Sequence, residues 1–107
     1  MAIEWHGVPD GELREMGRYF HALKDVLRLR ILVTLAASGE MTVTELARTL
    51  HVSQPLVSFH LRPLRALELV QVRRSGREVR CSINLPEIRR RQDEFVKVLV
   101  KTANLDP

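Results

Sequence analysis

The chain has 107 residues, 45% hydrophobic and 28% charged, which is enough for one globular domain with a modest core and is unlike a disordered chain. No apolar run approaches the ~18 residues that a membrane-spanning helix needs, and no basic segment leads into an apolar one at the start, as a signal peptide requires. A single cysteine excludes an internal disulfide and predicts a protein of the reducing cytoplasm.

The net charge of +4 is unevenly distributed along the chain. Residues 48–80 contain seven arginines and two glutamates, whereas residues 1–25 contain five acidic and three basic side chains. The positive charge therefore gathers in the middle of the chain, where it would suit a phosphate backbone. Taken alone, this feature is equally typical of a solvated basic face.

The first nine residues lack periodicity and are punctuated by glycine and proline, so we expect a loose arm. Trp5 is expected to pack on a dimer partner or on the outer helices. Asp10 is expected to cap a first helix that runs to about Ala22. The apolar stripe of this helix comprises Leu13, Met16, Phe20 and Leu23.

A second helix is predicted to begin after Asp25 as its N-cap and to end at Gly39. Its apolar positions are expected to pack against the segment that follows. These positions are Leu27, Ile31, Leu32 and Leu35.

Residues 42–67 contain two further helix starts separated by a tight turn. Thr42 and Glu45 form a capping box, and Ser53 is a second N-cap with Pro55 in the first turn that follows. A short helix, a tight turn and a longer helix make the helix-turn-helix pattern. The apolar faces of the two helices are Val43, Leu46, Ala47 and Leu50, and then Val57, Leu61 and Leu64.

Two residues depart from an ideal version of this pattern. His51 closes the first helix of the motif, where a left-handed conformation would cost on the order of 1 kcal/mol. Pro63 lies inside the second helix, where it removes one backbone hydrogen bond and is expected to bend the last turn.

A β-hairpin is predicted directly after the motif. Residues 69–72 are a strand candidate, residues 73–77 (R-R-S-G-R) a basic tip, and residues 78–83 a return strand. A helix-turn-helix followed by an arginine-tipped hairpin is a winged helix, so the expected fold is mainly α with a small β-hairpin. A plain αα-hairpin in a small helical domain is the alternative that the helix caps alone do not exclude.

A last helix is predicted at about 86–103, after Asn84 and Pro86. No later element covers its long apolar face, so we expect it to pair with its own copy, beside the first helix at about 10–22. Packing back on its own domain is the alternative. Residues 1–107 would then form one winged-helix domain with flanking dimerisation helices, whose interface residues are Leu13, Met16, Phe20, Phe95 and Leu99.

The stretch from His21 to Ile83 resembles the ArsR/SmtB family of bacterial winged-helix repressors. Residues 23–32 (L-K-D-V-L-R-L-R-I-L) are similar to the family's usual opening, and residues 53–61 (S-Q-P-L-V-S-F-H-L) are similar to its recognition helix. Residues 67–77 are similar to its approach to the wing. The resemblance implies a homodimer whose outer helices make the interface and which binds an imperfect inverted repeat in a promoter.

Roles on DNA follow from position along the recognition helix. Gln54 and Ser58 are placed to reach base edges in the major groove. Phe59 either contacts a thymine methyl group or covers the edge of the core, and His60 is either a base contact or a structural histidine. The side chains expected to hold phosphates are Arg62, Arg65, Arg74 and Arg77, with Arg77 also placed to enter the minor groove.

The absence of two metal-site motifs found in relatives limits which signals such a regulator could sense. Residues 42–44 are T-V-T where relatives with a thiol site have C-V-C, and no histidine follows His60, so two familiar metal sites are absent. Cys81 alternates with apolar residues and is predicted to be a small core residue. The remaining candidates are His6 and His21, with Glu4 and Asp10 as further ligands at the dimer edge, and such nitrogen and oxygen ligands suit nickel or zinc. The short, thiol-poor chain also resembles nickel-responsive members of the family.

No enzyme is predicted, because the sequence shows no glycine-rich phosphate loop, no paired acids and no nucleophile with a base. A winged helix used only for protein contacts is the rival function, and it would be expected to lose its wing arginines. The chain retains these as Arg73, Arg74, Arg77 and Arg80. We therefore predict a sequence-specific DNA-binding transcriptional regulator. We also predict that it responds to nickel or zinc through a site without thiol ligands.

Overall fold

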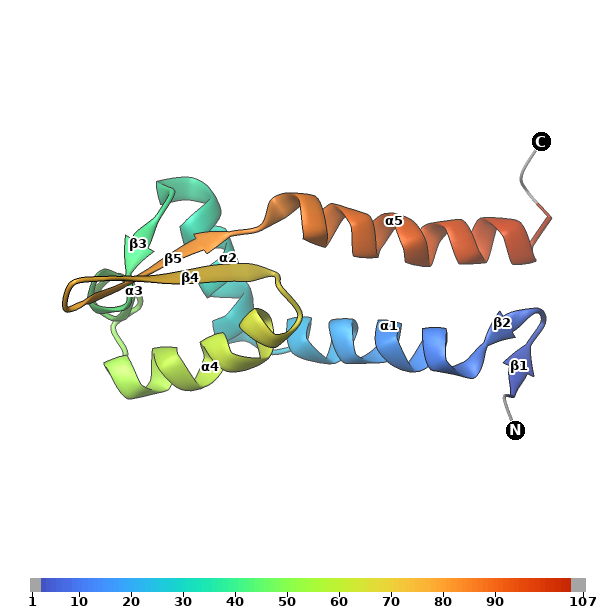
Figure 1. The fold of residues 1–107 in the computed structure, drawn as a ribbon, viewed down its shortest axis with the longest axis horizontal. Coiled ribbons are helices and arrows are strands. Elements are labelled where there is room, and N and C mark those ends of the chain that lie inside the picture. Colours follow the sequence, from blue (N-terminus) through green and yellow to red (C-terminus); the bar gives the residue numbers. More distant parts are fainter. Residues whose placement is uncertain (1–2, 105–107) are drawn as a thin grey trace.

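The computed structural model describes residues 3–104, so Met1 and Ala2 of the expected arm lie outside the described residues. The helices are α1 (Asp10–Leu23), α2 (Val26–Ser38), α3 (Val43–Leu50), α4 (Gln54–Ala66) and α5 (Leu85–Thr102). The strands are β1 (Glu4–Trp5), β2 (Val8–Pro9), β3 (Met41–Thr42), β4 (Val70–Ser75) and β5 (Glu78–Ile83). Figure 1 shows α2 to β5 gathered at one end, with α1 and α5 projecting from them.

The helix boundaries come from local hydrogen bonds that the sequence predicts. The Arg28 backbone N–H donates to the Asp25 carboxylate at 3.1 Å, which caps α2. Thr42 and Glu45 complete the capping box of α3 with bonds of 3.0 and 3.1 Å. His51 ends α3 in the left-handed conformation at φ 55°. Pro63 lies inside α4 without ending it, since the helix continues to Ala66.

The core lies where α2, α3, α4 and the sheet meet. Its centre is made of side chains with no more than 1% exposure, which confirms the predicted apolar faces of these helices. They are Ile31, Leu35, Leu46, Val57, Leu64, Leu69, Val70 and Cys81. Cys81 is thus the small core residue that the alternation around it predicts.

The sheet has three strands rather than the two of a simple hairpin. β5 is central and pairs antiparallel with β4 and with the short β3, in the order β3-β5-β4. The prediction of a five-residue basic tip is wrong in its bounds. Ser75 pairs with Glu78, so the turn is only Gly76 and Arg77, and Arg73 and Arg74 belong to β4.

The expectation of a loose N-terminal arm is also wrong for its described part. β1 and β2 form a small antiparallel hairpin whose turn uses positive φ values at His6 (53°) and Gly7 (86°). Asp10 does not cap α1 but is its first residue, and its carboxylate accepts hydrogen bonds from Trp5 and Arg14. Trp5 therefore contacts the start of its own α1.

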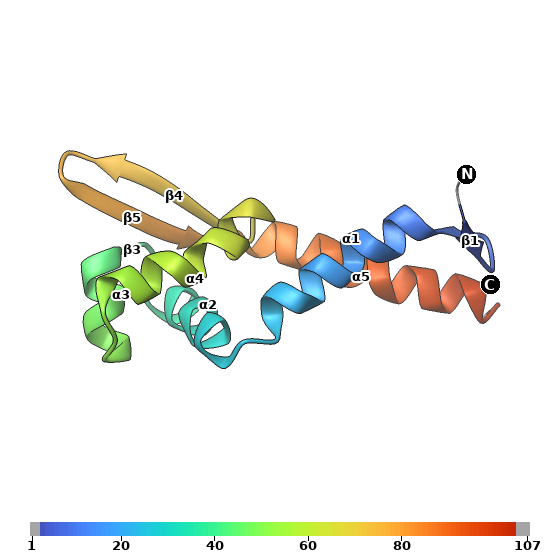
Figure 2. The ribbon, with the colours of Figure 1, turned by 90° about the horizontal axis from the view of Figure 1, so that it is seen from below.

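The projecting arm is formed by α1 and α5, which lie side by side in both views, with the β1–β2 hairpin at its tip (Figures 1 and 2). Tyr19 and Ala22 are the buried residues of α1, whereas Leu13 and Met16 of the predicted stripe are half-buried. The rings of Phe20 and Phe95 meet edge to face at 4.8 Å.

α5 has no fully buried residue, although it contacts α1 of its own chain. Val96 and Leu99 are 54% and 52% exposed, so the apolar face that the sequence predicts is left largely open. No helix among residues 3–104 is long and apolar enough to cross a membrane.

Candidate nucleic-acid interface

The N-terminal half of α4 presents polar side chains beside the wing. Ser53 caps this helix by accepting from the Leu56 backbone N–H at 3.3 Å, and the buried Val57 fixes which face turns inward. Gln54 and Ser58 are consequently exposed. Both line a groove of about 510 Å³. Its other walls are the start of α3, the β4–β5 turn and β5, and they include Thr44, Arg77 and Arg80. The structure thus brings two predicted base-reading residues together with a wing arginine.

Phe59 lies on the outer face of α4 and is 55% exposed. Its ring meets the ring of His60 edge to face at 5.2 Å, and it is not among the side chains packed against the core. Of the two predicted roles, the exposed position fits a DNA contact rather than a cover over the core edge.

His60 is held inside the domain instead. The guanidinium of Arg28 donates to its Nδ1 at 3.2 Å, and the Asp25 carboxylate lies 3.8 Å from the same nitrogen. The hydrogen bond from the Arg28 backbone N–H keeps the pKa of Asp25 below its usual value. Since its side chain is only 12% exposed, His60 fits the structural role of tying α4 to α2.

The arginines of this face fall into two groups. Arg73 donates two hydrogen bonds to Glu40, at 3.1 and 2.8 Å, and Arg80 pairs with Glu78 at 2.7 Å. Four others are exposed and form no ion pair with any residue in the described part of the chain. They are Arg62, Arg65, Arg74 and Arg77, the same four that the sequence assigns to phosphates.

Glu40 is a residue that the sequence reasoning missed. It follows α2 and reaches the wing, where its carboxylate holds Arg73 and also lies 3.8 Å from Arg80. The pKa of Glu40 is lowered chiefly by the hydrogen bonds from Arg73. No local pattern identifies this pair, because 33 residues separate its members and only the fold brings them together.

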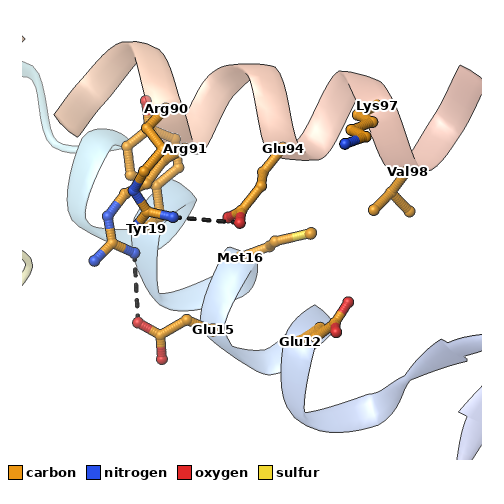
Figure 3. Close-up of a pocket in the computed structure, with 9 residues that line it drawn as sticks. All are labelled: Glu12, Glu15, Met16, Tyr19, Arg90, Arg91, Glu94, Lys97 and Val98. Atoms are coloured by element: carbon orange, nitrogen blue, oxygen red, sulfur yellow. Dashed lines mark hydrogen bonds and ion pairs between the residues drawn. The ribbon is translucent and has the colours of Figure 1, made fainter. Parts of the chain in front are cut away.

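Arg91 is a second residue whose contacts the sequence does not predict. Although it is on α5, it donates to the backbone carbonyl of Leu67 just after α4 and to Glu15 on α1, at 3.2 and 3.4 Å. Its guanidinium also lies over the ring of Tyr19, 5.9 Å from the centroid. Arg91 therefore joins the arm to the end of α4. Figure 3 shows its contact with Glu15 of α1.

A pocket of about 380 Å³ opens between α1 and α5 beside Arg91. Figure 3 shows its lining of acidic and basic side chains together with Met16 and Val98, with Arg90 paired to Glu94. The Tyr19 hydroxyl at its inner end is buried without a hydrogen-bond partner among residues 3–104, and burial raises the pKa of this phenol.

The candidate metal ligands are not brought together within one chain. His6 lies in the β1–β2 turn and His21 near the far end of the 14-residue α1, which spans ~20 Å at 1.5 Å per residue. Among the described residues, no group of three or more histidine, cysteine or acidic side chains could hold a metal ion. Burial also raises the pKa of Cys81 to about 11, so its thiol is a poor ligand at neutral pH.

Residues 25–72 match the model of the arsR family of bacterial regulatory proteins. The chain is 35% identical over 95 residues to the arsenic resistance transcriptional regulator ArsR1 of Pseudomonas putida, covering 86% of this chain and 73% of that one. This chain belongs to the ArsR family. It spans about half to three quarters of the length of the curated relatives it matches.

Solved structures of ArsR-type proteins share the fold. An ArsR-like transcriptional regulator from Rhodococcus superposes with a TM-score of 0.77 at 28% identity, covering 88% of each chain. A homodimeric winged helix-turn-helix DNA-binding domain from Mycobacterium bovis superposes with a TM-score of 0.66 at 29% identity, covering 83% of this chain and 81% of that one. The predicted winged helix is confirmed.

Proposed function

We propose that this ArsR-family protein binds an inverted-repeat operator as a homodimer and regulates transcription there. Gln54 and Ser58 read base edges in the major groove. The four exposed arginines of α4 and the wing hold phosphates on either side and fix the register. The observation that supports this best is the groove itself, in which both polar side chains of α4 lie opposite Arg77 of the wing.

The same proposal assigns dimerisation to α1 and α5. Leu99 and Val96 of α5 and Phe20 of α1 remain exposed in a single chain, although large apolar side chains of this kind favour burial. Leu13, Met16 and Phe95 are half-buried next to them. The homodimeric state of the domain from Mycobacterium bovis supports a dimer for this chain as well. Residues 1–107 would then act as one winged-helix unit with two dimerisation helices.

A thiol-free effector site is the third part of the proposal. The curated relatives include regulators of arsenic and cadmium resistance by name. Within one protomer of this chain the candidate ligands do not fit a metal, because His6 and His21 lie at opposite ends of α1. A nickel or zinc site built on these histidines therefore requires both subunits. We propose such an intersubunit site, with nitrogen and oxygen ligands only.

The first experiment is selection of bound sequences from a random duplex library with the purified chain. We expect enrichment of an inverted repeat whose half-sites lie about one helical turn apart, as two symmetry-related recognition helices require. Metal analysis and DNA-shift titration of the same sample, with and without chelator, then test the effector. Selection that enriches no repeat would contradict operator binding. A DNA affinity that is the same with and without nickel or zinc would contradict the metal site alone.

A further inference from the structure

The tip of the arm carries an exposed tryptophan in a fixed position. Trp5 is the single tryptophan of the chain, lies on the β1–β2 hairpin and is 56% exposed. Its indole N–H donates to the Asp10 carboxylate at 3.2 Å, which holds the ring beside the first residue of α1. A large aromatic side chain held in water in this way is typical of a contact surface.

The base of the arm carries an apolar cleft of about 450 Å³ between α1 and α4. Small residues keep it open: Gly17 has no atom within 4 Å of the position that a Cβ would take, and Ala22 and Ala66 form opposite walls. The remaining lining residues are Arg18, His21, Pro63 and Leu67. Because the walls are almost entirely apolar, the cleft favours an apolar occupant.

Two-fold symmetry places the tip of one arm level with the base of the other. The apolar residues Leu13, Met16 and Phe20 are centred near the middle of α1, so a two-fold axis through this stripe pairs two arms in opposite directions. Asp10 and Leu23 are equally far from the middle of α1. The axis therefore places Asp10 of one subunit at the level of Leu23 of the other, and Trp5 lies beside Asp10.

Charge on the two surfaces is also complementary. Glu4 is exposed next to Trp5 at the tip. Arg18 of α1 lines the cleft, and its side chain is 65% exposed. An incoming hairpin would thus bring the Glu4 carboxylate toward Arg18 while the indole of Trp5 enters the apolar cleft.

We propose that Trp5 of each subunit docks into the cleft between α1 and α4 of its partner. This inference rests on the proposed dimer and adds a contact outside its α1–α5 interface. The docked hairpin touches the C-terminal half of the partner's recognition helix, so assembly and the position of α4 become linked. The same docking carries His6 of one subunit toward His21 of the other, since His21 lines the cleft and His6 follows Trp5.

Fluorescence of the single tryptophan tests the docking directly. In the dimer we expect emission at shorter wavelength, and weaker quenching by acrylamide, than in the same chain unfolded by urea. Gly17→Leu fills the cleft at a position with open space and suits a helix, and Ala66→Glu places a charge on the opposite wall. Both variants should remain dimers by sedimentation while their emission moves to longer wavelength.

Disulfide cross-linking tests whether residue 5 of one subunit lies next to residue 66 of the other. In a Cys81→Ala background, Trp5→Cys with Ala66→Cys should give a covalent dimer on oxidation, because docking brings the two positions within the reach of a disulfide. The control pair is Trp5→Cys with Arg48→Cys, which keeps the number of thiols and should stay unlinked because Arg48 lies on α3.

The outcomes separate the two proposals. A dimer in sedimentation whose Trp5 emission matches the unfolded chain, with no cross-link to position 66, overturns the docking and leaves the α1–α5 dimer standing. A monomer at all concentrations overturns both. A cross-linked dimer with shielded Trp5 supports the docking.

Discussion

At the scale of single residues, the interface separates side chains that read bases from those that hold phosphates. Gln54 is exposed at the start of α4, where a recognition helix enters the major groove. Gln54→Ala should lose ~1–3 kcal/mol on the selected repeat and little on random DNA, because a lost base contact matters only on the correct sequence. Gln71→Ala is the matched control, since Gln71 is exposed but does not line the groove. Equal losses on both DNAs would contradict base reading by Gln54.

The wing arginines differ in whether they already have a partner. Arg77→Ala should weaken binding to all sequences alike and lower the salt slope by about one unit, because one phosphate contact is lost. Arg73→Ala should lower that slope much less, since Glu40 already neutralises Arg73. Titration of both variants between low and moderate salt checks this. If the two variants changed the slope equally, the division into paired and free arginines would be wrong.

At the scale of elements, the wing is braced from α2 by the Glu40–Arg73 pair. Because the pKa of Glu40 is lowered, the pair stays ionised at neutral pH and is lost only as the pH falls below about 4.5. Glu40→Gln should free Arg73 for phosphate, raise the salt slope by about one unit and narrow the difference in affinity between the repeat and random DNA. Glu68→Gln removes the same charge without freeing an arginine and is the control. An unchanged slope in Glu40→Gln would contradict the brace.

Sequence reasoning succeeded for elements whose signals are local. The caps Asp25, Thr42 and Ser53, and the left-handed His51, are each decided within a few residues, and all four are where the pattern places them. It failed for two short pairings. β3 joins the sheet through β5, which lies about 40 residues further along the chain. The N-terminal hairpin is local, but its strands have two residues each and leave no period in the sequence.

The candidate site shows the same division. Gln54, Ser58 and the four free arginines were predictable, because position on a helix or in a hairpin decides their exposure. Glu40 and Arg91 were not, because each acts on residues more than 20 positions away. For His60 the sequence motif left two roles open, a base contact and a structural histidine. The hydrogen bond from Arg28 on α2, which only the fold provides, favours the structural role.

At the scale of the whole molecule, the projecting arm of a single chain leaves large apolar side chains exposed. Leu99→Glu places a charge where the proposed dimer buries an apolar side chain, so the variant should be a monomer with weak DNA binding. Lys101→Glu also adds an acid, at an exposed position two residues along α5 on the opposite side of the helix, and should remain a dimer. Sedimentation of the two variants decides between them. A Leu99→Glu dimer would show that the interface lies elsewhere.

The most direct test of the central claim is the salt dependence of affinity for the selected inverted repeat and for a scrambled duplex of the same length. Four free arginines per protomer give eight phosphate contacts per dimer, so log K should fall with log salt with a slope of roughly −7. At physiological salt the repeat should bind at least ~10³-fold more tightly than the scrambled duplex. Binding that does not respond to salt, or equal affinity for the two duplexes, would contradict operator recognition by this winged helix.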